Sequence, residues 1–358
     1  MNHPSPIPVT ILTGFLGAGK TTLLNRLHQA GLLERTAVII NEFGEVGLDR
    51  QLFGSASDEV VELGNGCICC TVRGALVDTL MDMSNRDLGR VVIETTGLAD
   101  PSPVIQAIIG HPLLSGTFRL SQVLTLVDLM HGEATLQEFA EARMQAAMAD
   151  RIVFTKSDIA HLPETAIRRL QNTIRTINPA AEFVLPEAQT RLADLLAETG
   201  MNLKRDAGSA VHDHAHCNDD HDHSLHRHEQ DPRIAHQGIS SLVLVHDSPL
   251  PVRVIETFCE LLASAHGSQL LRLKGLVNVA ENPLPLVVHG VRGTFHEPVF
   301  LKAWPDKDHS TRIVVILKGL DPKFVQRLFD GFANRISTDT ADRAALMDNP
   351  LAISGFRQ

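Results

Sequence analysis

Two groups of residues near the start of the chain have the types and spacing to do chemistry. The first, residues 14–21 (GFLGAGKT), fits the phosphate-binding pattern GxxxxGK[ST] at every fixed position. Its glycines let successive backbone N–H groups point at phosphate oxygens, and the helix expected after it adds the positive end of its dipole. We expect Lys20 to reach the β- and γ-phosphates and the Thr21 hydroxyl to ligate Mg²⁺. The nucleotide contacts predicted here are Gly14, Gly17, Ala18, Gly19, Lys20, Thr21 and Thr22.

The second group is a set of three thiols, Cys67, Cys69 and Cys70, in a glycine-containing turn. Thiolates favour Zn²⁺, Co²⁺ or Cu⁺, and three thiols this close in sequence can place at least two on one ion. A lone cysteine is often a small buried hydrophobe, but the CxCC pattern favours a metal site. The fourth ligand is open among Glu42, Glu45, a histidine, water and a residue of a client protein.

A third feature is the polar tract at residues 212–228, which holds seven of the 18 histidines and almost no apolar residues. Such a tract cannot form a core, so residues 206–236 are predicted to be a disordered linker. Imidazoles on a flexible chain bind Zn²⁺, Ni²⁺ or Co²⁺ weakly and without fixed geometry. We hypothesise that the tract gathers metal for the CxCC site; the alternative is a solvated linker with incidental histidines. The weak metal contacts predicted in it are His212, His214, His216, His221 and His223.

The elements that must position these groups alternate between strand and helix over the first part of the chain. Apolar runs predict strands at residues 7–12, 37–40, 91–94, 123–127 and 152–155, and helical spacing follows the phosphate-binding loop at residues 21–28. This alternation is typical of a mostly parallel sheet in an α/β domain. The sequence therefore predicts a P-loop NTPase fold over residues 1–205.

After the linker, the pattern changes to that of a smaller α+β domain over residues 237–337, followed by an extension at residues 338–358. Phe295, Phe300 and Trp304 are expected in the core of this domain. Its predicted strands lie at residues 239–245, 270–279, 285–291 and 312–317, and its predicted helices at residues 252–265 and 322–336.

Three more segments fit a nucleotide-dependent switch. Glu94 ends a buried-type strand, where it can act through the Mg²⁺ shell, and the backbone N–H of Gly97 can sense a γ-phosphate. Glu42 follows the second strand and is the candidate group that orients the attacking water, so Lys20, Glu42 and Gly97 are the candidate catalytic groups. Slow intrinsic turnover is expected, since no glutamine or arginine is identified for that task.

Residues 155–158 (TKSD) follow another apolar strand and resemble the guanine-reading pattern NKxD, with threonine in the first place. The Asp158 carboxylate can accept from the N1–H and 2-amino groups of guanine, a donor pair that adenine lacks. The Lys156 stem would lie over the purine face. Thr155, Lys156 and Asp158 are therefore predicted to bind the base of GTP.

Composition narrows the class of protein. A net charge of −10 and a pI near 6.0 argue against a nucleic-acid partner, which needs clustered Lys and Arg. No apolar run approaches the roughly 20 residues of a membrane span, and the N-terminal segment lacks the charged region of a signal peptide. Five cysteines, three of them crowded, fit a reducing compartment. We expect a cytoplasmic protein without a membrane partner.

The segments GFLGAGKTTLLN, NEFGEVGLD, GNGCICC, ETTGLADP and TKSD, in this order, resemble the CobW family of SIMIBI-class P-loop GTPases. The resemblance covers residues 7–200 and continues to residues 239–332, where LLRLKGLVNV and HGVRGTF are similar to the C-terminal domain of that family. It implies GTP hydrolysis coupled to the handling of Zn²⁺ or Co²⁺ and delivery of metal to a client metalloprotein. Carried over by position, it places Lys20, Thr21 and Thr22 at the phosphates and Mg²⁺, Thr155, Lys156 and Asp158 at the base, and Cys67, Cys69 and Cys70 at the metal.

The resulting hypothesis is a metallochaperone in which GTP and Mg²⁺ bring the thiolates together and hydrolysis releases the metal. One alternative is a zinc storage or buffering protein with minor GTPase activity, which the histidine tract favours and the intact phosphate loop opposes. Another is a P-loop small-molecule kinase, which gives no reason for CxCC or TKSD. The client protein, the metal used in the cell and the oligomeric state stay open at this point.

Overall fold

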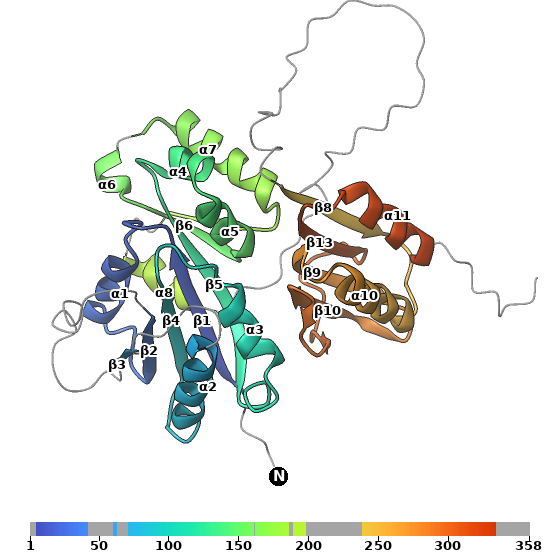
Figure 1. The fold of residues 1–358 in the computed structure, drawn as a ribbon, viewed down its shortest axis with the longest axis horizontal. Coiled ribbons are helices and arrows are strands. Elements are labelled where there is room, and N and C mark those ends of the chain that lie inside the picture. The colour runs from blue at the N-terminus through green and yellow to red at the C-terminus, as the bar shows by residue number, and fades with distance from the viewer. Residues whose placement is uncertain are drawn as a thin grey trace, which may run out of the picture.

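A sheet of parallel strands forms the centre of the first domain in the computed structural model, which describes residues 5–41, 60–62, 71–160, 162–185, 189–197 and 238–333 (Figure 1). The strand order in the described part is β3-β2-β4-β1-β5-β6-β7. The inner strands are apolar on both faces, as is typical of parallel strands that are covered on both sides. This confirms the predicted α/β P-loop fold. The strands are β1 Ile7–Gly14, β2 Thr36–Asn41, β3 Val60–Glu62, β4 Arg90–Thr95, β5 Phe118–Asp128, β6 Arg151–Thr155 and β7 Glu182–Val184.

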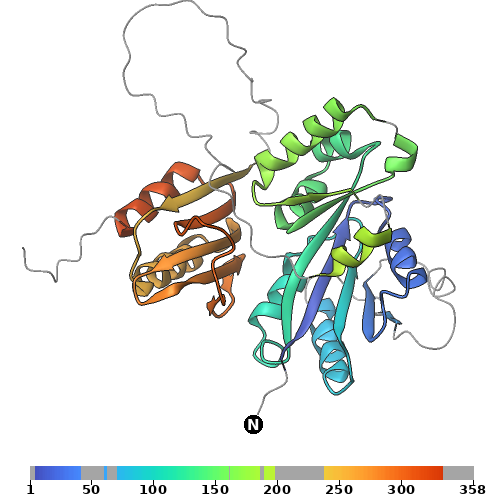
Figure 2. The same cartoon turned by 180° about the vertical axis from the view of Figure 1, so that it is seen from behind.

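Helices cover both faces of this sheet. On one face, α1 (Lys20–Gln29) and α8 (Gln189–Leu196) pack with the strands around Leu24 and Leu195 (Figure 2). The other face is the larger core, built around Ile105 and Phe154. The helices on that side are α2 Thr71–Met83, α3 Ser102–Gly110, α4 Gly132–Glu138, α5 Ala140–Met148, α6 Ser157–Ala160 and α7 Glu164–Ile177. The result is a three-layer sandwich whose strands all end at the same edge.

The second domain is an antiparallel sheet backed by two helices. Its strand order is β11-β10-β9-β13-β8, with β12 paired to β10. Phe258 of α10 and Phe329 of α11 meet edge to face over one side of the sheet at a centroid distance of 5.3 Å. The elements are β8 Ile239–His246, α10 Val252–His266, β9 Leu270–Val279, β10 Asn282–Val291, β11 Thr294–Phe295, β12 Val299–Phe300, β13 Thr311–Lys318 and α11 Pro322–Ala333.

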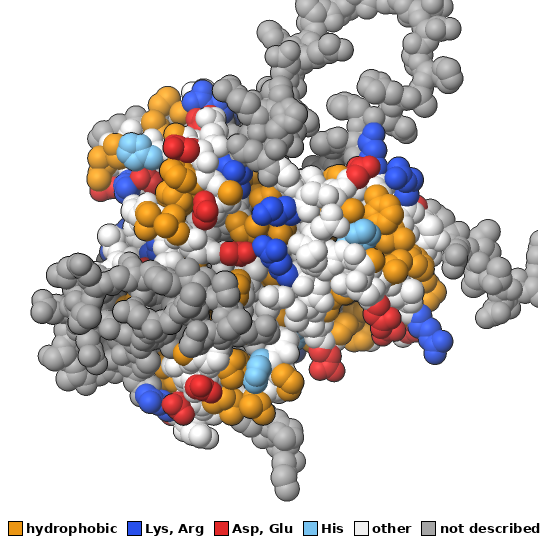
Figure 3. Space-filling view, in the orientation of Figure 1, with side chains coloured by type: hydrophobic (Ala, Val, Ile, Leu, Met, Phe, Trp, Pro, Cys, Tyr) orange, Lys and Arg blue, Asp and Glu red, His pale blue; other side chains and the backbone are white. Residues whose placement is uncertain are grey.

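The other side of the antiparallel sheet packs on the first domain. Leu271, Val291, Val314 and Ile316 are buried in the same apolar cluster as α3, α5 and α7. Charged side chains of both signs line the boundary between the two domains on the surface (Figure 3). The two domains therefore share a continuous apolar core across the interface.

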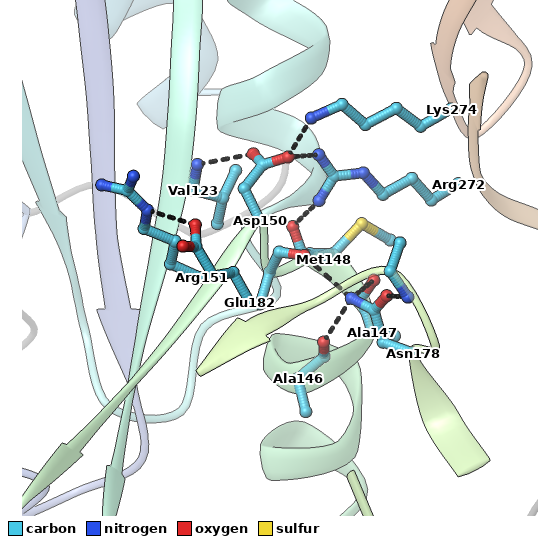
Figure 4. Close-up of polar contacts among 12 residues, drawn as sticks. Val123, Ala146, Ala147, Met148, Asp150, Arg151, Asn178, Glu182, Arg272 and Lys274 are labelled. Carbon is cyan, nitrogen blue, oxygen red and sulfur yellow. Dashed lines mark hydrogen bonds and ion pairs between the residues drawn. The ribbon is translucent and has the colours of Figure 1, made fainter. Parts of the chain in front are cut away.

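A buried ion-pair cluster lies within this interface (Figure 4). Asp150 Oδ1 accepts from Arg272 Nη2 at 2.6 Å and from Lys274 Nζ at 2.5 Å, while its Oδ2 accepts from the Val123 backbone N–H at 2.8 Å. Arg272 also donates to the carbonyl of Met148. Burial alone would raise the pKa of Asp150, but the charges of Arg272 and Lys274 outweigh it and lower that pKa below its usual range. The carboxylate is therefore ionised at neutral pH and joins β9 to the start of β6.

The expected places of Phe300 and Trp304 in the core need correction. Phe300 is 40% exposed on the short strand β12, and Trp304 stacks on His309 and donates to the Pro283 carbonyl outside the core; of the three aromatics, Phe295 packs against the core. The short strands β3 and β7 were not predicted, because three residues give too little pattern.

The predicted linker at residues 206–236 and the extension at residues 338–358 lie outside the described residues, and the domain boundaries stay predictions. Within the described ranges, no helix is long and apolar enough to cross a membrane.

Candidate nucleotide-binding site

The predicted nucleotide residues meet at the carboxyl edge of the parallel sheet. The strands β1, β4 and β6 end there at Gly14, Thr95 and Thr155, and each is followed by a loop that carries predicted site residues. Ligands of open α/β sheets bind outside the carboxyl ends of the strands, so the position is the expected one.

The phosphate-binding loop needs its glycines for a physical reason. Gly14 has φ +145°, and a Cβ there would lie 2.6 Å from the carbonyl oxygen of Leu126 on the neighbouring strand. Gly19 has φ +94° at the N-terminus of α1, where no side chain caps the helix. A phosphate can therefore supply the acceptor that the first turn of α1 needs. Lys20 Nζ donates to the carbonyl of Gly14 at 3.0 Å, which holds its ammonium group against the loop.

A hydroxyl in the first turn of α1 and a carboxylate near the end of β4 lie close together beside this loop. Thr21 Oγ1 is 3.5 Å from Glu94 Oε1, and Glu94 is only 6% exposed. Next to them, Thr95 Oγ1 donates to Thr13 Oγ1 at 2.7 Å and ties β4 to β1. Hydroxyl and carboxylate oxygens are ligands that Mg²⁺ accepts, so this donor set fits the predicted cation. Bound there, Mg²⁺ would neutralise charge on the phosphates.

The predicted base-binding segment is connected to the phosphate loop. Thr155 Oγ1 donates to the carbonyl of Ala18 at 2.7 Å. Lys156 has φ +61°, and its ammonium group pairs with Asp128 Oδ2 at 2.5 Å. Asp158 lies in the first turn of α6. Threonine in the first position of the predicted motif thus connects the two loops by a side-chain hydrogen bond.

The β4–α3 loop, residues 96–101, packs directly on the phosphate loop. A Cβ at Gly97 would lie 2.7 Å from the Leu16 backbone nitrogen, so glycine is required at this approach. The side chain of Gln145, on α5, donates to the carbonyls of Gly97 at 3.1 Å and Ala99 at 3.2 Å. Leu16 and Gln145 were not predicted as site residues, because neither carries a sequence signal apart from the fold.

Several predicted site residues lie outside the described part of the chain. This set comprises Glu42, Glu45, Cys67, Cys69, Cys70, His212, His214, His216, His221 and His223. The ends of the segment that holds the thiols are described: β3 ends at Glu62, which pairs with Ile40 of β2, and α2 begins at Thr71. Since Ile40 also pairs with Glu94, this segment leaves the sheet at the same edge as the nucleotide site.

The described residues offer no competing metal site. Among them, no group of three or more His, Cys, Asp and Glu side chains is placed to hold an ion. Cys259 is buried in α10, and burial, with a smaller effect of Glu260, raises the pKa of its thiol to about 12. A thiol held neutral in this way is a poor metal ligand.

A glycine loop between β1 and α1, with a hydroxyl and a carboxylate beside it, and a predicted base-binding segment after β6 are the features of a P-loop nucleotide-binding protein. The comparisons with known proteins narrow this class. Residues 8–185 match the family described as CobW/HypB/UreG, nucleotide-binding domain, and residues 239–333 match the cobalamin synthesis protein cobW C-terminal domain. The chain belongs to the CobW family of P-loop GTPases, as the sequence resemblance predicted.

Similar proteins carry names that bear on function. The chain is 34% identical to the zinc chaperone YjiA of Escherichia coli over 87% of this chain and 94% of that protein. It is 32% identical to the zinc chaperone CobW of Pseudomonas aeruginosa over 90% of each chain. The crystal structure of Zn(II)-bound YjiA GTPase from E. coli superposes with a TM-score of 0.61 and 27% identity, covering 92% of this chain and 99% of that one.

Proposed function

We propose that this protein is a GTP-hydrolysing metallochaperone. It binds Zn²⁺, or Co²⁺, through Cys67, Cys69 and Cys70 and delivers the metal to a client metalloprotein under the control of the nucleotide. The observation that carries the proposal is that β3, which leads into the segment with the thiols, ends at the same edge of the sheet as β4, which leads into the nucleotide site. The names of the similar zinc chaperones support the choice of metal.

The nucleotide half of the proposal assigns each residue a task. The backbone of the phosphate loop and Lys20 hold the phosphates, Thr21 and Glu94 hold Mg²⁺, and Asp158 selects guanine. The N–H of Gly97 meets the γ-phosphate, and Glu42 orients the attacking water. The close approach of Gly97 to Leu16 of the phosphate loop supports a response of the β4–α3 loop to the γ-phosphate.

The metal half uses the same loops. Ordering of the chain around GTP brings the thiolates of Cys67, Cys69 and Cys70 together, with Glu42 or Glu45 as further ligands. Hydrolysis loosens the site and releases the ion to the client. The five linker histidines His212, His214, His216, His221 and His223 gather metal weakly for this site.

A zinc storage or buffering protein with minor GTPase activity is the second candidate, and the histidine tract is the feature that favours it. In that case metal binding would not depend on the nucleotide. The Thr155–Ala18 hydrogen bond joins the proposed base and phosphate loops, and it supports the intact nucleotide site that the first candidate needs.

An anaerobic Co²⁺ titration followed by visible absorption tests the proposal. The wild type, Cys69→Ser/Cys70→Ser and the control Cys259→Ala are compared with GDP and with a non-hydrolysable GTP analogue plus Mg²⁺. We expect intense tetrahedral thiolate bands in the wild type and the control, stronger or tighter with the GTP analogue, and none in the double variant. Bands of equal intensity and affinity with both nucleotides would favour the storage protein, and the absence of bands in the wild type would refute the metal site.

A further inference from the structure

The β4–α3 loop contacts both domains. At its start, Gly97 packs on Leu16 of the phosphate loop. At its end, Asp100 Oδ2 accepts from Arg292 Nη2 of the C-terminal domain at 2.8 Å. One short loop thus lies between the proposed γ-phosphate position and the second domain.

The Asp100 carboxylate is held in a fixed orientation. Its Oδ1 accepts from the Ser102 backbone N–H at 2.8 Å and from the Ser102 hydroxyl at 2.5 Å, at the first turn of α3. The side chain of Gln145 donates to the carbonyls of Gly97 and Ala99 in the same loop. A change in the position of Arg292 would therefore be passed to the whole loop rather than absorbed by one side chain.

Arg292 occupies an unusual backbone conformation. It has φ +49° in the turn between β10 and β11, and Gly293 after it has φ +75°. Paired residues Val291 and Thr294 close a two-residue hairpin of the kind that favours Asn-Gly. Arginine is disfavoured at such a position, so its presence indicates a task for its side chain.

A second contact holds the same turn against α3. Gln106 Nε2 donates to Thr294 Oγ1 at 3.2 Å and to the Arg292 carbonyl at 3.4 Å. The hairpin is thus docked on α3 by its backbone as well as by the ion pair.

The exposure of the Arg292–Asp100 ion pair favours a role in positioning the loop over a role in folding stability. The side chains of Arg292 and Asp100 are 27% and 36% exposed. Ion pairs this accessible contribute little to folding stability, because solvent screens them. The buried cluster around Asp150 and the shared apolar core carry the docking of the two domains instead.

We propose that Arg292 is a positioning residue for GTP hydrolysis. Its guanidinium group holds the β4–α3 loop, through Asp100, in the arrangement that presents the Gly97 N–H to the γ-phosphate. The C-terminal domain is thereby part of the GTPase switch, and the γ-phosphate in turn shifts the β10–β11 turn. This inference rests on the assignment of Gly97 under Proposed function.

The test compares Arg292→Asn, Arg292→Lys and Asp100→Asn in the full chain. Asparagine tolerates positive φ and removes the guanidinium group, while lysine keeps the charge. Ser241→Ala is the matched control, because it removes a different hydrogen bond between the domains, to the Thr176 carbonyl at 3.1 Å. Single-turnover GTP hydrolysis, GDP affinity and thermal stability are measured for each.

We expect Arg292→Asn and Asp100→Asn to lower the hydrolysis rate by roughly three- to tenfold, with GDP affinity and thermal stability close to wild type. Arg292→Lys should recover part of the rate. The Asp100→Asn/Arg292→Asn double variant should be no slower than either single variant, since both remove the same contact. A wild-type rate in Arg292→Asn, or an equal loss in Ser241→Ala, would overturn the proposal.

Gly97→Ala separates failure of this inference from failure of the underlying assignment. Alanine keeps the backbone N–H, but its Cβ would meet the backbone of Leu16 and displace the β4–α3 loop. A variant that retains GDP binding and hydrolyses GTP at the wild-type rate would show that hydrolysis does not depend on the position of this loop, and it would refute both the assignment of Gly97 and the role of Arg292. A large loss of rate in Gly97→Ala together with a wild-type rate in Arg292→Asn would leave the assignment standing and refute the role of Arg292.

Discussion

Thr155 Oγ1 donates a hydrogen bond of 2.7 Å to the carbonyl of Ala18, and this contact joins the loop assigned to guanine with the loop assigned to phosphate. The two loops are far apart in sequence, but the parallel sheet brings the ends of β1 and β6 to one edge, with β5 between them. The geometry of one loop therefore depends on the other.

Thr155→Val should weaken nucleotide binding while keeping the shape of the side chain. Loss of the hydrogen bond leaves the Ala18 carbonyl without this donor, and a contact of this kind contributes about 1 kcal/mol, or roughly fivefold in affinity. Thr155→Ser keeps the hydroxyl and should bind nearly as the wild type does. Titration with a fluorescent GDP analogue measures both; equal affinities for the valine and serine variants would contradict the bridging role.

Asp158→Asn should change the preferred base. The carboxylate is assigned to accept from guanine N1–H and the 2-amino group, and two charge-assisted hydrogen bonds account for roughly a hundredfold or more in affinity. An asparagine amide can instead donate to the 2-oxo group of xanthine. Competition among GTP, ATP and xanthosine triphosphate measures the change, and wild-type discrimination between GTP and ATP in this variant would refute the assignment.

Asp150→Asn should destabilise the protein strongly. It leaves Arg272, whose side chain is 4% exposed, without its buried counter-charge, and breaking such a pair costs about 3–5 kcal/mol. Glu182→Gln is the matched control: its partner Arg151 directly follows Asp150 in the chain, but Glu182 is 57% exposed, so the loss should be under about 1 kcal/mol. Urea unfolding compares the two; similar losses would show that the Asp150 cluster does not hold the interface.

Stability should fall as the pH decreases through about 6.5, the ordinary pKa of histidine. Burial lowers the pKa of His289 well below that value, and Arg272 and Lys274 lower it further against the opposing charge of Asp150. The unfolded chain then binds a proton that the folded chain does not, so stability is lost on acidification at up to about 1.4 kcal/mol per pH unit. His289→Gln should flatten this slope in urea unfolding between pH 7.5 and 5.5, and an unchanged slope would contradict the argument.

The sequence predicted the parts of the site that local pattern determines. Glycines at fixed spacing after a β-branched run give the phosphate loop, and the apolar runs before Glu94 and Thr155 give β4 and β6. These signals lie within a few residues of one another. Gln145, which holds the Gly97 carbonyl, and Arg292, which pairs with Asp100, depend on contacts between residues far apart in the chain. No periodicity encodes such contacts, so the interface could be seen only in the folded chain.

The exposure of Phe300 was missed for the same reason, because it depends on how strands pair in the folded chain. Its residue type alone predicts a place in the core. However, β12 pairs with β10 outside the main strand order of the sheet, and Phe300 is 40% exposed there. Val299, the other residue of β12, is 52% exposed as well, so the place of this strand in the sheet, rather than residue type, leaves Phe300 exposed.

The central claim, that nucleotide and metal binding are coupled, is tested most directly by a closed thermodynamic cycle. Zn²⁺ affinity is measured by competition with a chelator in the presence of GDP and of a non-hydrolysable GTP analogue, and the affinities of GDP and of that analogue are each measured with and without Zn²⁺. The account predicts that the GTP analogue tightens Zn²⁺ binding at least fivefold relative to GDP, roughly the lower end of typical allosteric couplings, and that Zn²⁺ tightens the analogue relative to GDP by the same factor. Zn²⁺ affinities that are equal with the two nucleotides would contradict it.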